Sequence, residues 1–108
     1  LWGDLHSDLL REGPPVNAWE DMTRRLNEVT RRLAEVAGVQ PELPYWVAGD
    51  FLRATALTML TWAWLRIDAA AASAPEPARW QRASTAMRHW VAPEFEMRLA
   101  IMQARLPV

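Results

Sequence analysis

The sequence predicts an all-α protein, an antiparallel four-helix bundle whose last helix is kinked or broken at Pro93. Apolar residues recur at steps of three and four along most of the chain, and Gly or Pro clusters divide it at three places. No stretch shows the period of two expected of a strand. With 108 residues, of which 51% are hydrophobic, the chain has enough material for one core, and we expect residues 1–108 to form a single helical domain.

Composition excludes several classes of protein. A formal net charge of -1 without a basic block gives no large attraction to nucleic acid or to an anionic membrane. The absence of Cys excludes disulfides, thiolate metal sites and a cysteine nucleophile. The longest uncharged apolar-rich run lies between Arg53 and Arg66, shorter than the roughly 20 residues that a membrane span needs. No signal-peptide pattern is seen, so we expect a cytoplasmic protein.

The first predicted helix begins at Leu1 and ends at the segment 12–15, where Gly and two prolines stop it. Its apolar pattern is already under way at the first residue. We therefore expect the chain to be the C-terminal part of a longer polypeptide.

The second predicted helix begins at Asn17, which with Glu20 forms a variant of the capping box, and ends at Gly38. It has one apolar stripe, so one of its faces should be buried and the other solvated. The stripe consists of Trp19, Met22, Leu26, Val29, Leu33 and Val36.

The central predicted helix runs from Tyr45 to Ala72. Its large apolar residues point to nearly every azimuth at 100° per residue, so we expect it to be buried on most sides. They are Phe51, Leu52, Leu57, Met59, Leu60, Trp62, Trp64, Leu65 and Ile67. The other helices can cover about two of its sides, and the remaining surface is predicted to meet another domain or subunit.

The last helical segment follows a breaker at residues 73–77 and carries a stripe from Trp80 to Val91. Pro93 then either kinks one long helix or begins a new one, with Glu94 and Glu96 near the positive end of its dipole. Apolar residues continue the stripe to Leu106.

No catalytic, cofactor-binding or metal-ligating residue is predicted. His6 and His89 are the only histidines, and neither has a second ligand at a spacing that makes a metal pair. The charged residues of the central helix are more simply explained as structural ion pairs or exposed helix ends than as catalytic groups. These are Asp50, Arg53, Arg66 and Asp68.

Seven tryptophans are the strongest anomaly of composition, and Trp is favoured both in cores and at interface hot spots. Trp62 and Trp64 lie about 200° apart on a helix, so they cannot serve one face. Core packing alone explains the tryptophans in one interpretation. In the other, the interface residues are Trp46, Trp62, Trp64 and Trp90.

Three segments resemble the C-terminal helical region of bacterial FAD-dependent acyl-CoA dehydrogenases of the extended C-terminal type. The segment 5–13 (LHSDLLREG) is similar to the family's Asp-Leu helix and basic-Asp-Gly turn. Phe51-Leu52-Arg53 and Trp64-Leu65-Arg66 are similar to its aromatic-Leu-Arg to Trp-Leu-Arg helix, and 91–94 is similar to its Leu-Pro-Glu. Gln81 and Met87 depart from the Lys and Arg that the family often has.

The resemblance implies a parent enzyme that oxidises an acyl-CoA with FAD. Its base and its flavin-binding segment would precede Leu1, and this chain would be a non-catalytic domain that packs on the remainder of the flavoenzyme or on an identical subunit in a homo-oligomer. The alternative is a free-standing helical bundle that acts as an oligomerisation or protein-interaction module. A small-molecule or haem-binding bundle is a third hypothesis.

Overall fold

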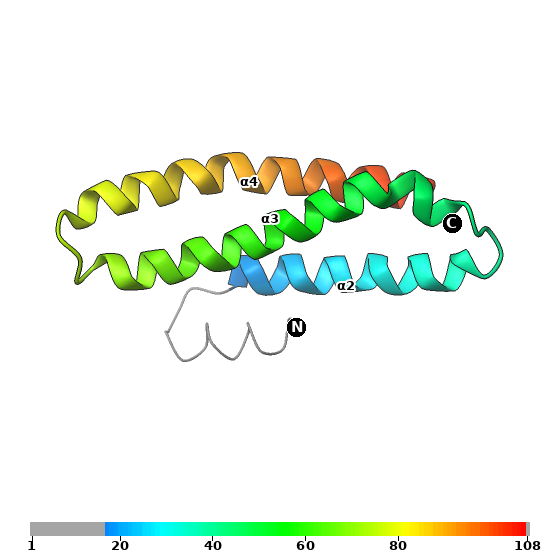
Figure 1. Cartoon of the computed structure of the whole chain (residues 1–108), viewed down its shortest axis with the longest axis horizontal. Coiled ribbons are helices and arrows are strands. Elements are labelled where there is room, and N and C mark those ends of the chain that lie inside the picture. Colours follow the sequence, from blue (N-terminus) through cyan, green and yellow to red (C-terminus); the bar gives the residue numbers. More distant parts are fainter. Residues whose placement is uncertain (1–16, 108) are drawn as a thin grey trace.

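The computed structural model describes residues 17–107, which form three α-helices joined by short turns: α2 (Asn17–Ala37), α3 (Leu43–Ala71) and α4 (Pro77–Arg105). Successive helices run antiparallel (Figure 1). The all-α class is confirmed, with three helices and no strand in this part of the chain. The segment predicted as the first helix lies outside the described residues, so the structure supports a three-helix arrangement and not the predicted four-helix bundle.

Helix α2 has the single buried stripe that its sequence predicts. Five of the six stripe residues are buried and Val36 is partly buried. The opposite face is solvated and carries ion pairs one turn apart, such as Arg31 with Glu35 at 3.2 Å. The helix ends at Ala37, directly before Gly38, and the backbone N–H of Gln40 donates to the carbonyl of Val36.

Helix α3 is not buried on most sides, and that prediction is wrong. Its buried residues all lie on one side, because α2 and α4 both pack there. They are Leu43, Val47, Ala54, Leu57, Thr58 and Ala71. On the other side Tyr45 is 82% exposed and Leu52 is 71% exposed.

The core is built around α3, which packs closely on α4 and along part of α2, whereas α2 and α4 contact each other at few points. Figure 1 shows α3 crossing in front of the other two helices. Leu57, Phe95 and Leu99 are each at most 1% exposed and lie in one cluster with the α2 stripe. Between α2 and α4, Arg25 of α2 pairs with Glu96 of α4 (Nη2 to Oε2, 2.6 Å).

Helix α4 continues through Pro93 from Pro77 to Arg105, so of the two predicted alternatives the broken helix is wrong, and the segment forms one helix (Figure 1). Proline has no N–H, so the carbonyl of His89 loses its usual donor four residues on. Both residues are exposed, which leaves that carbonyl accessible to water. Solvent therefore offsets part of the cost that would break a buried helix.

Replacing Pro93 by Ala should raise the free energy of unfolding by about 1 to 2 kcal/mol, because it restores a helical hydrogen bond and relieves the ring contact. Urea unfolding followed by circular dichroism measures the change. The matched control is Ala86→Pro, exposed and two turns earlier on the same side of α4, which should cost about 3 kcal/mol. An unchanged or lowered stability in Pro93→Ala would contradict this account of α4.

Candidate protein-interaction surface

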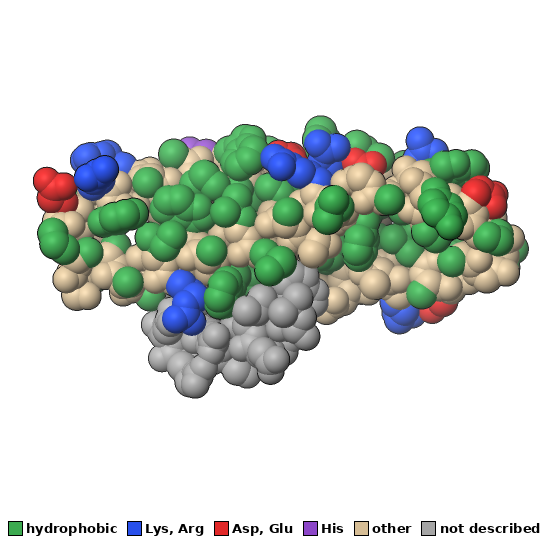
Figure 2. Space-filling model, viewed as in Figure 1, with side chains coloured by type: hydrophobic (Ala, Val, Ile, Leu, Met, Phe, Trp, Pro, Cys, Tyr) green, Lys and Arg blue, Asp and Glu red, His purple; other side chains and the backbone are tan. Residues whose placement is uncertain are grey.

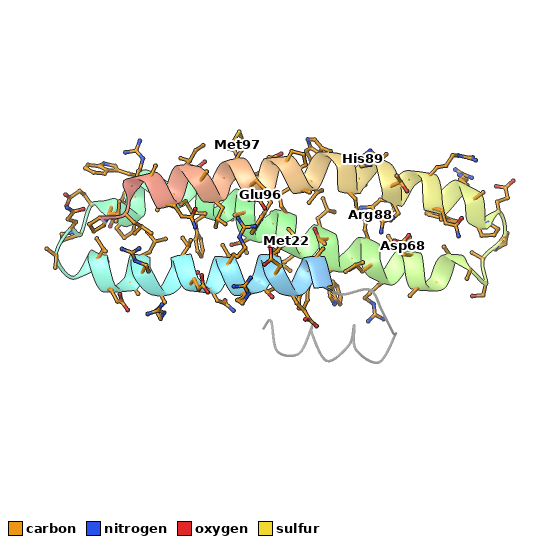
Figure 3. All side chains as sticks on the ribbon, turned by 180° about the vertical axis from the view of Figure 1, so that it is seen from behind. Met22, Asp68, Arg88, His89, Glu96 and Met97 are labelled. Atoms are coloured by element: carbon orange, nitrogen blue, oxygen red, sulfur yellow. The ribbon has the colours of Figure 1, made fainter. Side chains whose placement is uncertain are left out.

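Several large apolar side chains are exposed on the side of α3 and α4 away from the core. We call this surface the apolar face and define it by six side chains that are 37% to 82% exposed: Tyr45, Trp46, Leu52, Met59, Trp90 and Ile101. Figure 2 shows hydrophobic side chains gathered over α3 and α4 on this side, with most charges toward the edges and ends. Met97, 46% exposed, adjoins the apolar face on the outer side of α4 and points away from the other helices (Figure 3).

Along α3 the apolar face follows a heptad pattern. Large residues recur at Tyr45, Leu52 and Met59, and small residues alternate with them at Gly49, Ala56 and Ala63. The steps of four and three average 3.5 residues, which is the period of a helix seam that packs against another helix. All six residues are outside the buried set of α3. The monomer therefore leaves a helix-packing seam unpaired among the described residues.

Packing within the described chain does not require a glycine at position 49 of this seam. A Cβ built on Gly49 would meet no heavy atom within 4 Å, so no neighbour in the described chain needs the space. Glycine within a helix costs roughly 1 kcal/mol relative to alanine. Its presence on an exposed helix surface is explained better by a close approach from outside than by packing within the chain.

Four alternating charges join α3 to α4 beside the apolar face. Arg98 donates to Asp50 at 3.0 Å and to Glu94 at 3.5 Å, while Arg53 binds Glu94 with both its Nε and its Nη2, the latter at 2.9 Å. The Arg53 guanidinium also lies over the ring of Trp90, 5.4 Å from its centroid. These four charged groups are therefore paired within the molecule.

The pKa of Glu94 is lowered from its usual value, chiefly by the hydrogen bond from Arg53. Desolvation is the second-largest effect and opposes the shift, and the charge of Arg53 with the hydrogen bond and charge of Arg98 adds to the lowering. The prediction that Asp50, Arg53 and Asp68 form structural ion pairs is confirmed, since Asp68 pairs with Arg88 of α4 at 3.2 Å (Figure 3). Arg66 lies over the ring of Trp62 at 5.3 Å.

The four predicted interface tryptophans do not share one surface. Trp46 and Trp90 are 56% and 48% exposed and both belong to the apolar face. Trp62 and Trp64 are half-buried, and Trp64 lines the contact between α3 and α4. The two most exposed residues of the apolar face, Tyr45 and Leu52, were not predicted at an interface, because that prediction was based on the tryptophan content. The heptad spacing along α3 identifies both residues.

A second apolar feature is a groove between the end of α2 and the start of α3, with an empty volume of about 670 Å³ that includes open solvent. It has no charged residue, and the hydroxyl of Thr30 in its wall already donates to the carbonyl of Leu26 at 2.8 Å. It is lined by Thr30, Leu33, Ala34, Ala37, Pro44, Val47, Ala48 and Phe51. Such a groove suits an apolar side chain from a partner and offers no polar group to orient a substrate.

A small cavity between α3 and α4 is a poor substrate site. Its volume is about 20 Å³, enough for roughly one water molecule. The fully buried hydroxyl of Ser84 lies in its wall and has no hydrogen-bond partner among the described residues. The ion pair of Asp68 and Arg88 also contributes to the lining (Figure 3). A buried water bonded to Ser84 fits this space, and a metabolite does not.

Within residues 17–107 no group of three or more His, Asp or Glu side chains is arranged to hold a metal ion. His89 is exposed and points away from the other helices (Figure 3), and His6 lies outside the described residues. In the same part of the chain, none of the helices combines the length and the apolar character needed to cross a membrane.

Comparison of the chain with protein-family models, with curated proteins and with solved structures finds no match.

Glu94→Gln should flatten the acid dependence of stability. Because the pKa of Glu94 is lowered in the folded state from 4.5, its contribution is fully present above about pH 4.5 and is lost as the pH falls below that value. Urea unfolding at pH 7 and pH 3 should show a smaller difference for Glu94→Gln than for the wild type. Glu35→Gln, in an exposed pair with Arg31, is the control with little effect. An acid dependence unchanged in Glu94→Gln would rule out this role for the network.

Proposed function

We propose that this chain is a helical association module that packs against another protein surface through the apolar face. The observation that carries the proposal is the exposure of six large apolar side chains on one side of α3 and α4. With about half of roughly 200 Å² exposed on each, they leave roughly 600 Å² of apolar surface. The largest apolar patch on a typical monomeric protein covers about 300 to 600 Å² and often serves an interaction, so the apolar face is at the upper end of that range.

The composition of the apolar face agrees with an interface. Tyr and Trp are enriched among hot spots, and charged residues are depleted from interface centres. The neighbouring charges Arg53 and Glu94, which bridge α3 and α4, are paired with each other. The role proposed is binding and not catalysis.

The larger protein proposed for this module is an acyl-CoA dehydrogenase-like flavoenzyme, of which the chain would be the C-terminal domain. This proposal rests on the resemblance of the segments given above. Leu52 and Arg53 of that resemblance lie on the exposed side of α3, where contact with the remainder of such an enzyme or with an identical subunit would form. The FAD would be held by segments before Leu1, the four-helix bundle would be completed by residues 1–12, and the compartment would be the cytoplasm. Flavin absorbance in the purified longer polypeptide would support this setting, and its absence would remove it.

The association itself is tested by a photoreactive benzoylphenylalanine placed at Leu52 in the producing cell. The control position is Arg31 of α2, whose side chain is 68% exposed on the solvated face. Irradiation should give a discrete adduct from Leu52 and none from Arg31, with the attached peptide identified by mass spectrometry. Equal yields from both positions, or none from Leu52, would sink the proposal.

Leu52→Glu should abolish association while leaving the fold intact. Leu52 is 71% exposed, so the change in the free energy of unfolding should stay within about 0.5 kcal/mol. The contrasting variant is Leu57→Ala, 1% exposed on the core side of the same helix, which should cost about 2 to 5 kcal/mol. Sedimentation velocity and urea unfolding measure the two effects. If Leu52→Glu unfolds the chain, or leaves association intact, the apolar face is not the binding surface.

A further inference from the structure

We propose that the apolar face is covered by a second copy of this chain, with two α3 helices packed antiparallel about a two-fold axis near Ala54. The inference rests on the proposed association function and adds the partner and the register. It follows from the heptad seam of α3, the charges at its two ends and the area of the apolar face.

The alternation of large and small residues makes the seam complementary to itself. When two α3 helices run antiparallel about an axis near Ala54, Leu52 of one copy faces Ala56 of the other. In the same register Tyr45 faces Ala63 and Met59 faces Gly49. Every large side chain then meets a small one, as knobs fit holes in a coiled-coil contact. A seam of only large residues would hold the helices apart.

Charge selects this register over its neighbour. With the axis near Ala54, Arg66 of one copy faces Glu42 of the other at each end of the contact. Both residues continue the heptad pattern, and Glu42 is exposed with no side-chain hydrogen bond to the N-terminus of α3. Sliding the helices by one heptad step keeps large residues against small ones but places Arg66 over Gly49. The antiparallel dimer of this register therefore brings opposite charges near each other at both ends of the contact, and the alternative does not.

The area agrees with a dimer. A stable interface buries about 800 Å² on each partner. The roughly 600 Å² of large apolar side chains, together with the alanines and backbone of the seam, approaches this value. The same two-fold brings α4 over α4 of the second copy, and Trp90 and Ile101 extend the contact there. Arg53 and Glu94 are paired within each copy, so the two faces meet without repulsion between unpaired charges.

Introduced cysteines test the register directly, because the chain has none of its own. Chains carrying Leu52→Cys are mixed with chains carrying Ala56→Cys and oxidised. A disulfide between these two variants is expected, and Leu52→Cys mixed with Ala63→Cys should give little. A higher disulfide yield with Ala63→Cys than with Ala56→Cys would establish the slid register. The control is Ala100→Cys, an exposed position on α4 away from the seam. If Leu52→Cys forms as much disulfide with Ala100→Cys as with Ala56→Cys, the antiparallel pairing is overturned.

A charge swap tests the same register without a covalent bond. Glu42→Arg alone and Arg66→Glu alone should each weaken the dimer, by roughly 3- to 10-fold in Kd for two exposed ion pairs. The double variant should recover most of the loss, because the swapped charges again face each other. Additive losses in the double variant, measured by sedimentation equilibrium, would contradict the proposed pairing of Glu42 with Arg66.

The mass of the photo-adduct formed at Leu52 separates this inference from the proposed function. An adduct of two identical chains supports both. An adduct with a different protein retains the association function and overturns the second copy as its partner. Failure to form any adduct at Leu52 overturns both.

Discussion

The packing of α3 against α2 and α4 on one side is the constraint on which the rest of the structure depends. Ala54, Leu57 and Thr58 lie at the centre of that contact and are at most 1% exposed. Because α2 and α4 hardly touch each other, α3 supplies most of the contacts that join them. One consequence is a stable buried contact on the side of α3 where both α2 and α4 pack. The other is that neither helix covers the opposite side of α3, although its sequence is as apolar as the buried side.

The threonine hydroxyls of α3 contribute to close packing at this buried contact. Thr55, Thr58 and Thr61 each donate to the carbonyl four residues earlier at 2.9 Å, so the polar atom of the buried Thr58 is satisfied within its own helix. Between α3 and α4, the charges of Asp50 and Arg98 are likewise paired. The polar groups beside the buried contact are therefore satisfied and do not oppose the packing of α3 on this side.

Much of the fold follows from the sequence because single stripes and breakers are local signals. The stripe of α2, the Gly38 end and the 73–77 breaker act within a few residues, and the structure agrees with them. The continuous course of α4 through Pro93 was left open, since it depends on whether solvent reaches the carbonyl of His89. Burial of α3 was overestimated because periodicity reports which residues are apolar and not which neighbours are present. The same excess predicted surface on α3 that α2 and α4 leave uncovered. The tryptophans predicted at an interface divide in the structure between the exposed Trp46 and Trp90 and the half-buried Trp62 and Trp64, which the sequence pattern does not distinguish.

Coverage of the apolar face by a second copy is measured most directly by hydroxyl-radical footprinting at increasing protein concentration. Met59 of the apolar face is 41% exposed in the single chain, and Val39, 84% exposed in the turn after α2, serves as the internal reference. The account predicts that oxidation of Met59 relative to Val39 falls as the dimer forms. A ratio that stays constant, while sedimentation shows the chain associating, would place the contact elsewhere and contradict the account.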